Sequence, residues 1–205
     1  DHRDLHSFPT RRSSDLVSTK LGDPTPEREG RLTLNPLAHL DPVGTLLMIL
    51  TGFGWAKPVG VNPSYYKDTK KGMALTAAAG PLANLIMAFA ALLIYAILHV
   101  LCIKLGFGTS VLNGVATFAQ LFAIRNLCFM VFNIIPIPPL DGAKVLGMFL
   151  PNKAYYTMLR YERYSMLLIM VLSLTGVLNG IIGTGVNFFF NGIINLLNSA
   201  INLIL

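Results

Sequence analysis

Long apolar runs alternate along this chain with short polar connectors that are rich in basic residues, proline and glycine. A helix needs about 20 apolar residues to cross the hydrocarbon core of a bilayer. A Gly-Thr-Gly sequence separates the last two runs and predicts a turn. The pattern predicts spans over approximately 73–100, 111–135, 164–183 and 186–205. The expected fold is therefore all-α, a polytopic transmembrane helical bundle.

Two segments depart from this simple pattern. Residues 43–56 are apolar but number only fourteen, so they predict a short re-entrant or interfacial segment with Trp55 at the headgroup level. Residues 133–142 read NIIPIPPLDG and contain three prolines within four residues. Each proline removes a backbone donor and restricts the residue before it to extended geometry. We therefore expect a Pro-broken helix at this point.

Composition and charge placement support a membrane protein. The chain has 205 residues, of which 53% are hydrophobic and 13% charged, against about 25% charged in soluble domains. The net charge of +6 is concentrated in two connectors, 57–72 and 144–163, with four Lys or Arg each. Two spans separate these connectors, so both lie on one side, and basic loops mark the cytoplasmic side. No nucleic-acid partner is expected, because the basic residues do not alternate with aromatic residues on a solvated surface.

The acidic residue at the end of the proline break admits two interpretations. Asp141 could N-cap a helix that starts near Ala143, with Gly142 easing the turn. It could instead face a wet cavity, because irregular backbone beside a span is tolerated where it is buried or lines water. Ionisable residues inside spans are costly and are usually functional. The residues alone leave the two interpretations about even.

The segment FNIIPIPPLDG resembles the NxxPxPPLDG signature of the site-2 proteases, a family of zinc intramembrane peptidases. Further stretches at 21–45, 52–59 and 77–85 are similar to the compact bacterial branch of that family. The resemblance implies a Zn²⁺ cofactor and makes Asp141 the third zinc ligand. It also places Asn133 near the active site in a substrate-binding or supporting role. Asn84, in AAAGPLANL, is a second supporting candidate.

The chain lacks the family's His-Glu-x-x-His motif, in which two histidines on one helical face bind zinc and the glutamate acts as base. By the family's spacing the motif is expected at Thr10, Arg11 and Ser14. All three lie within residues 4–16, DLHSFPTRRSSDL, which resemble the translation of a short-read sequencing adapter. We therefore interpret residues 1–16 as an artefactual tail that replaces the motif. Residues 17–205 are then expected to form a single membrane-embedded peptidase domain, truncated at its N-terminus.

Two other histidines are weaker candidates. His39, in NPLAHLDPVG, could ligate a metal, but a hydrogen-bonded structural or gating role is favoured over that. His99 lies near the end of a predicted span and is interpreted as an interfacial residue.

The activity implied by the resemblance is hydrolysis of peptide bonds within or near transmembrane segments of substrate proteins in a bacterial plasma membrane. As written, the chain is expected to be inactive, because His-Glu-x-x-His is absent. The alternative is a non-catalytic membrane protein, either a pseudoprotease or a transporter-like bundle, since broken helices with a carboxylate suit transporters too. The partners expected are a membrane-protein or peptide substrate and the lipid bilayer.

Overall fold

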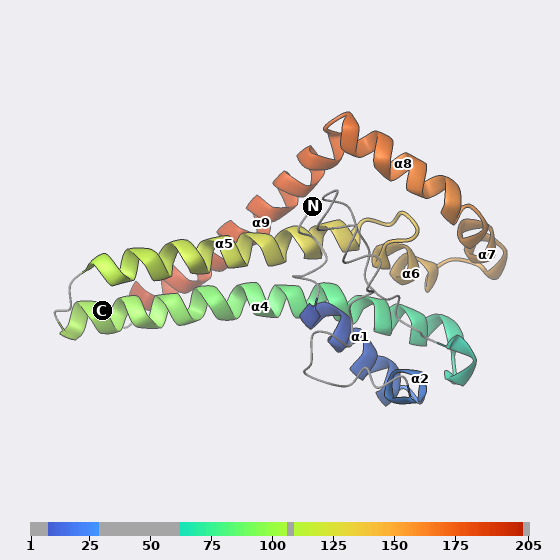
Figure 1. Ribbon diagram of the computed structural model, residues 1–205, viewed down its shortest axis with the longest axis horizontal. Helices are drawn as coiled ribbons and strands as arrows, with labels where there is room; N and C mark the ends of the chain where they lie inside the picture. The colour runs from blue at the N-terminus through green and yellow to red at the C-terminus, as the bar shows by residue number, and fades with distance from the viewer. Residues whose placement is uncertain (1–7, 29–61, 106–108, 203–205) are drawn as a thin grey trace, which may run out of the picture. The chain divides into compact units, whose positions relative to one another are not determined.

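The computed structural model of the protein describes residues 8–28, 62–105 and 109–202. These residues form helices and contain no strand (Figure 1). The elements are α1 (Phe8–Lys20), α2 (Thr25–Arg28), the 3-10 helix η2 (Pro63–Tyr65), α4 (Thr69–Leu105), α5 (Thr109–Ile134), α6 (Asp141–Gly147), α7 (Asn152–Arg160), α8 (Glu162–Leu174) and α9 (Val177–Asn202). The predicted re-entrant segment 43–56 and His39 lie outside the described residues.

Three of these helices are long and apolar enough to cross a membrane: α4, the Leu112–Ile134 part of α5, and α9. A helix rises 1.5 Å per residue, so the 37 residues of α4 extend over about 55 Å. That length exceeds the roughly 30 Å of a bilayer core. The expectation of an all-α, polytopic membrane fold with a helix broken at its prolines is confirmed.

The turn predicted at Gly-Thr-Gly is wrong. Helix α9 runs without interruption through residues 183–185, and the chain turns earlier, at Thr175 and Gly176. Gly176 has a φ of +78°, a left-handed conformation that glycine adopts at little cost and that ends helices. The predicted span 164–183 is consequently divided, and only the 13 residues of α8 precede the turn. Glycine within a membrane helix does not stop it, because the backbone hydrogen bonds remain satisfied inside the helix.

The described residues fall into two compact units. One comprises residues up to 83 together with 134–165, and the other comprises 84–133 together with 166–205. In the second unit α4 and α5 run side by side in opposite directions, and α9 packs along them (Figure 1).

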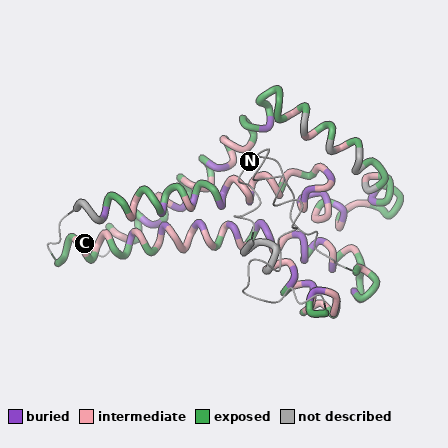
Figure 2. The backbone as a smooth tube through the Cα atoms, viewed as in Figure 1, coloured by how far each residue is buried: buried purple, intermediate pink, exposed green. Residues whose placement is uncertain are grey.

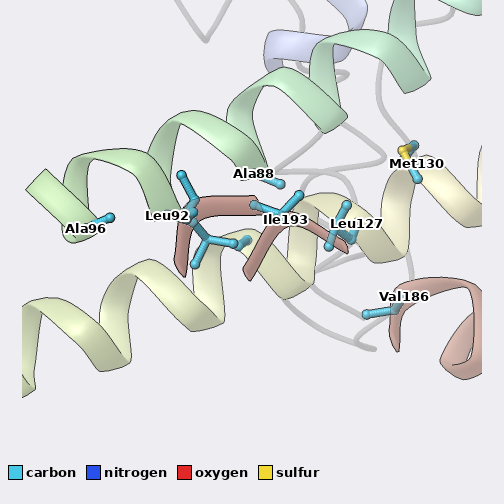
Figure 3. Packing of buried hydrophobic residues seen from close by; sticks show 9 residues of the cluster. Ala88, Leu92, Ala96, Leu127, Met130, Val186 and Ile193 are labelled. Carbon is cyan, nitrogen blue, oxygen red and sulfur yellow. The ribbon is translucent and has the colours of Figure 1, made fainter. Parts of the chain in front are cut away.

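The core of the second unit lies where these three helices meet (Figure 3). Its buried residues are Ala88, Leu92, Ala96, Ala123, Leu127, Met130, Val186, Ile193 and Leu197. The alanines let the helix backbones approach closely, as is common between membrane helices. Gly185 extends this close packing, since a Cβ built there would lie 2.7 Å from Cγ1 of Val131. Buried positions recur along the inner faces of the helices, while the outer faces are exposed (Figure 2).

In the first unit a lysine links the start of α4 to the segment between α6 and α7. Lys70 Nζ donates a 2.6 Å hydrogen bond to the carbonyl of Leu150. The same ammonium lies 5.4 Å from the ring centroid of Tyr155, within the range of a cation–π contact. Tyr155 is buried and packs over Gly147, where a Cβ would meet the ring at 2.5 Å. These contacts fix the short helix α6, which carries Asp141.

Candidate functional site

The proline segment forms a tight irregular connection between α5 and α6. Helix α5 ends at Ile134 and α6 starts at Asp141. Between them the backbone N–H of Ile137 donates to the carbonyl of Ile135 at 2.8 Å, and that of Leu140 donates to Ile137 at 3.0 Å. The Pro138–Pro139 peptide bond is cis. The chain thus leaves one helix and starts another within a few residues.

Gly142 is required for this geometry. A Cβ at this position would clash with the carbonyl group of Ile134 and would lie 2.6 Å from the carbonyl oxygen of Ile135. Backbone atoms of this kind cannot move aside as a flexible side chain can. Gly142 therefore allows the first turn of α6 to pack directly against the end of α5, and this contact sets the position of the adjacent Asp141.

Asp141 is the first residue of α6, and the N-cap position is occupied by Leu140, which makes no side-chain capping bond. The interpretation of Asp141 as the N-cap residue of a helix starting near Ala143 does not describe this arrangement. The carboxylate lies in the first turn, where the helix dipole favours negative charge. Its side chain is 25% exposed, and Oδ1 lies 3.5 Å from Nζ of Lys144. The carboxylate is therefore partly accessible and held at the start of a short helix.

The positions expected to carry the zinc motif, Thr10, Arg11 and Ser14, all fall within α1. Residues four apart share a helical face, so positions 10 and 14 have the spacing that the motif needs. The residue types do not. Zinc is bound in proteins by cysteine, histidine, aspartate or glutamate side chains, and within 8–28, 62–105 and 109–202 no group of three such residues could hold a metal. The residues that the structure describes therefore do not fit a zinc ion.

The end of α1 is anchored by a buried hydrogen-bond cluster around Asp23. Asp23 Oδ1 accepts from the backbone N–H of Thr25 at 3.0 Å and from its hydroxyl at 2.6 Å. Oδ2 accepts from the backbone N–H of Asn62 at 2.9 Å and from the hydroxyl of Ser18 at 2.9 Å. Asp23 and Ser18 are both fully buried. One carboxylate thus connects α1, α2 and the start of η2.

The cluster continues from Ser18 to α4. Ser18 Oγ lies 2.7 Å from the hydroxyl of Tyr66, and that hydroxyl lies 3.1 Å from Oγ1 of Thr76. A hydroxyl carries one proton. Because Ser18 donates its proton to Asp23, Tyr66 donates to Ser18, and Thr76 in turn donates to Tyr66.

The charge state of Asp23 follows from these contacts. Burial acts to raise the pKa of its carboxyl, but the hydrogen bonds from Thr25, Asn62 and Ser18 outweigh burial and hold the pKa below its usual value of 3.8. Sequence reasoning did not single out Asp23 and missed this cluster. The available signal was an acidic residue in a turn that follows the helix expected to carry the zinc motif.

The amide candidates lie on the membrane helices. Asn84, in α4, is completely buried, and Asn133 is half-buried at the end of α5, one residue before Ile134. Their supporting roles remain predictions. A third amide that sequence reasoning did not single out is Asn126, which is buried in α5 and donates a 2.9 Å hydrogen bond to the carbonyl of Phe122. His99 is half-buried in α4 with its ring centroid 5.9 Å from that of Tyr95.

Comparisons with known proteins support the family resemblance that the proline–aspartate segment suggested. The model of peptidase family M50 matches residues 96–178, which include Asn133, Asp141 and Gly142. The chain is also 36% identical over 159 residues to a protein of Bacillus subtilis (strain 168) named "Putative zinc metalloprotease YwhC". That alignment covers 78% of this chain and 72% of the relative. The chain belongs to peptidase family M50, the site-2 proteases. No solved structure gives a significant match.

Membership of this family and the three membrane-length helices together make this a membrane protein of a zinc metalloprotease family. The family is one of zinc enzymes, but Thr10, Arg11 and Ser14 are not residue types that bind zinc.

Proposed function

We propose that this chain is the scaffold of a multi-pass intramembrane endopeptidase of the bacterial plasma membrane, in which Asp141 is the third zinc ligand and Asn133 and Asn84 support substrate binding. The observation that carries the proposal is the placement of Asp141. It opens α6 directly after a membrane-length helix, its position is set by the contact of Gly142 with the backbone of Ile134, and it is partly accessible. The substrate class is the transmembrane or membrane-proximal segment of another protein.

In the sequence as written the metal site is incomplete. Thr10, Arg11 and Ser14 stand where two histidines and a glutamate are expected. A single carboxylate does not hold zinc tightly, because a catalytic zinc site in proteins takes three protein ligands. The purified 205-residue chain should therefore contain little zinc and cleave no peptide.

The direct test restores the expected residues. The variant T10H/R11E/S14H should gain about one zinc per chain and cleave a reporter transmembrane segment in detergent or proteoliposomes. Replacing Arg11 by Gln in the same background (T10H/R11Q/S14H) should retain zinc and lose cleavage. Adding D141N to the restored variant should lower zinc content sharply if Asp141 is a ligand.

Two results would contradict the proposal. Tight zinc binding by the unmodified chain would show that another set of residues forms a site. Zinc binding by the restored variant that is unaffected by D141N would remove Asp141 from the ligand set.

The second candidate function is a non-catalytic helix-binding membrane protein, which is favoured only if Thr10, Arg11 and Ser14 are native residues. Genomic sequence upstream of the codon for Val17 separates the two. An intact His-Glu-x-x-His there would establish the peptidase, and a clean reading without it would leave a pseudoprotease.

A further inference from the structure

Helix α9 carries a row of asparagines on a face that the other described helices do not cover. Asn187, Asn191, Asn195, Asn198 and Asn202 are all exposed. These five residues are called the asparagine row. Their spacings of four, four, three and four residues keep them on one side of a helix with 3.6 residues per turn.

The row runs along most of the helix. Gly180 and Thr184 continue the same spacing toward its start, so small or polar residues occupy positions 180, 184, 187, 191, 195, 198 and 202. The steps repeat as four, three, four over 11 residues, or about 3.67 residues per turn, which differs little from the helix itself. The row is therefore nearly parallel to the helix axis, and a second straight helix could contact it along its whole length.

The row lies opposite the face that packs against α4 and α5. Val186 in the core and Asn195 in the row are nine residues apart, or about two and a half turns, which places them on opposite sides of α9. The outer face of α4 shows a different composition, since its large exposed residues from position 82 to 103 are all apolar, namely Leu82, Ile86, Ile94, Ile97, Leu98, Leu101 and Ile103. Helix α5 exposes polar residues mainly near its start, at Asn113, Thr117 and Gln120.

An amide exposed to hydrocarbon has no hydrogen-bond partner, and its transfer there from water is energetically unfavourable. In the part of the chain that the structure describes, the side chains of the asparagine row make no hydrogen bond with one another or with other residues. Next to the row, the Ser199 hydroxyl donates a 2.9 Å hydrogen bond to the backbone carbonyl of Asn195, which leaves the Asn195 amide itself unused. In a helix of membrane-spanning length, a row of this kind needs a polar partner that continues over several turns.

We propose that the asparagine row is a dimerisation surface, buried against the same row of a second copy of this chain. An asparagine side chain donates and accepts hydrogen bonds equally, so a row of asparagines is complementary to itself across a two-fold axis. Helix α9 contains no charged residue, so two copies meet without repulsion and without requiring an opposite charge. Gly180 has no atom within 4 Å of a Cβ built on it, which leaves room for close approach of a neighbouring helix.

The proposal is tested by cross-linking in membranes. In a C102A/C128A background, which removes both native cysteines, the single variants N191C and N195C should form a disulfide-linked homodimer under mild oxidation. The matched control is L196C. Leu196 is also exposed, at 60%, but is five residues from Asn191 and so points about 140° away around the helix. L196C should not cross-link.

A second measurement addresses affinity. The variant N191L/N195L/N198L removes three amides but keeps an apolar helix that inserts readily, and it should weaken dimerisation by about 10-fold or more in a dilution series followed by energy transfer in liposomes. The corresponding glutamine variant, N191Q/N195Q/N198Q, retains the amides and should preserve most of the association. L196A should leave it unchanged.

Several results would overturn the proposal. These are a monomer at all protein-to-lipid ratios, equal cross-linking through L196C, or no effect of the leucine variant. Reaction of N191C with a water-soluble thiol reagent in a monomer would assign the row to a water-filled path instead. Cross-linking of N191C to a different polypeptide would assign it to another helix. None of these measurements depends on zinc or cleavage, so their outcome is independent of the peptidase proposal.

Discussion

At the scale of single residues, Asp23 shows how one buried carboxylate organises several backbone segments. It accepts four hydrogen bonds from Ser18, Thr25 and Asn62, and through Ser18 and Tyr66 it is connected to Thr76 on α4. A buried charge is tolerated only where such bonds replace its water. Asp23 thus fixes the end of α1, the helix that contains the positions expected for the zinc motif.

This arrangement predicts an acid-sensitive anchor. Because the pKa of Asp23 is lower in the folded protein than its usual 3.8, its contribution to stability is complete above about pH 4. That contribution is lost as the pH falls toward the folded value. Hydrogen exchange of the α1 amides, corrected for the intrinsic pH dependence of exchange, should therefore accelerate below about pH 4.

The variant D23N should expose the same contribution. It should raise α1 exchange at pH 6 by the equivalent of about 2 kcal/mol, since hydrogen bonds to a charged acceptor are lost. The difference between D23N and the original chain should shrink as the pH falls. A difference that is constant with pH would show that the charge of Asp23 is not the source of the anchor.

At the scale of elements, the contact between α5 and α9 depends on a single missing side chain. Gly185 lets α9 approach Val131, and a Cβ there would lie 2.7 Å from one Val131 methyl group and 3.0 Å from the other. Gly183, in the same Gly-Thr-Gly sequence, has no atom within 4 Å of such a Cβ. The two glycines are therefore chemically equal but differ in their surroundings.

The pair provides a matched test of packing. Alanine at either position gains the same intrinsic helix propensity over glycine, so G183A should be neutral or stabilising. G185A should be less stable than G183A by about 1–2 kcal/mol, because Val131 must shift. Unfolding of the two variants in mixed detergent micelles measures the difference. Equal stabilities would mean that α9 and α5 are not in close contact at this point.

At the scale of the whole molecule, α4 is long enough for both of its ends to leave a bilayer. Lys71, with 70% of its side chain exposed, lies near its start, and Lys104 lies near its end. The first end adjoins a basic connector and the second adjoins a loop with few charges. Basic connectors favour the cytoplasmic side.

Labelling of single cysteines in the C102A/C128A background tests this topology. A water-soluble thiol reagent should label K71C from the cytoplasmic side only and K104C from the opposite side only. I94C is the control, because Ile94 is exposed on the apolar outer face of α4 and should react from neither side. Labelling of K71C and K104C from the same side would exclude α4 as a transmembrane helix.

Much of the site could be predicted from the residues, but not its surroundings. The three prolines determine where α5 ends, because no helix continues through them, and the LDG residues give the family and the candidate ligand Asp141. The sequence could not show that Gly142 packs against the backbone of Ile134, or that Asp23 accepts a bond from Asn62, 39 residues away. Such contacts depend on which distant segments meet.

The division between the two sources of information has a physical reason. Hydrophobicity, length and proline act locally, so the sequence by itself determined that this protein is all-α, that it spans a membrane and that a helix breaks before Asp141. Where a turn forms, and which face of a helix is buried, depend instead on packing between segments that are distant in the sequence. The tertiary structure alone therefore decided that Gly176 rather than Gly-Thr-Gly ends the preceding helix. It also decided that Val186, Ile193 and Leu197 face the core, so that the asparagines lie on the opposite side of α9, which the other described helices do not cover.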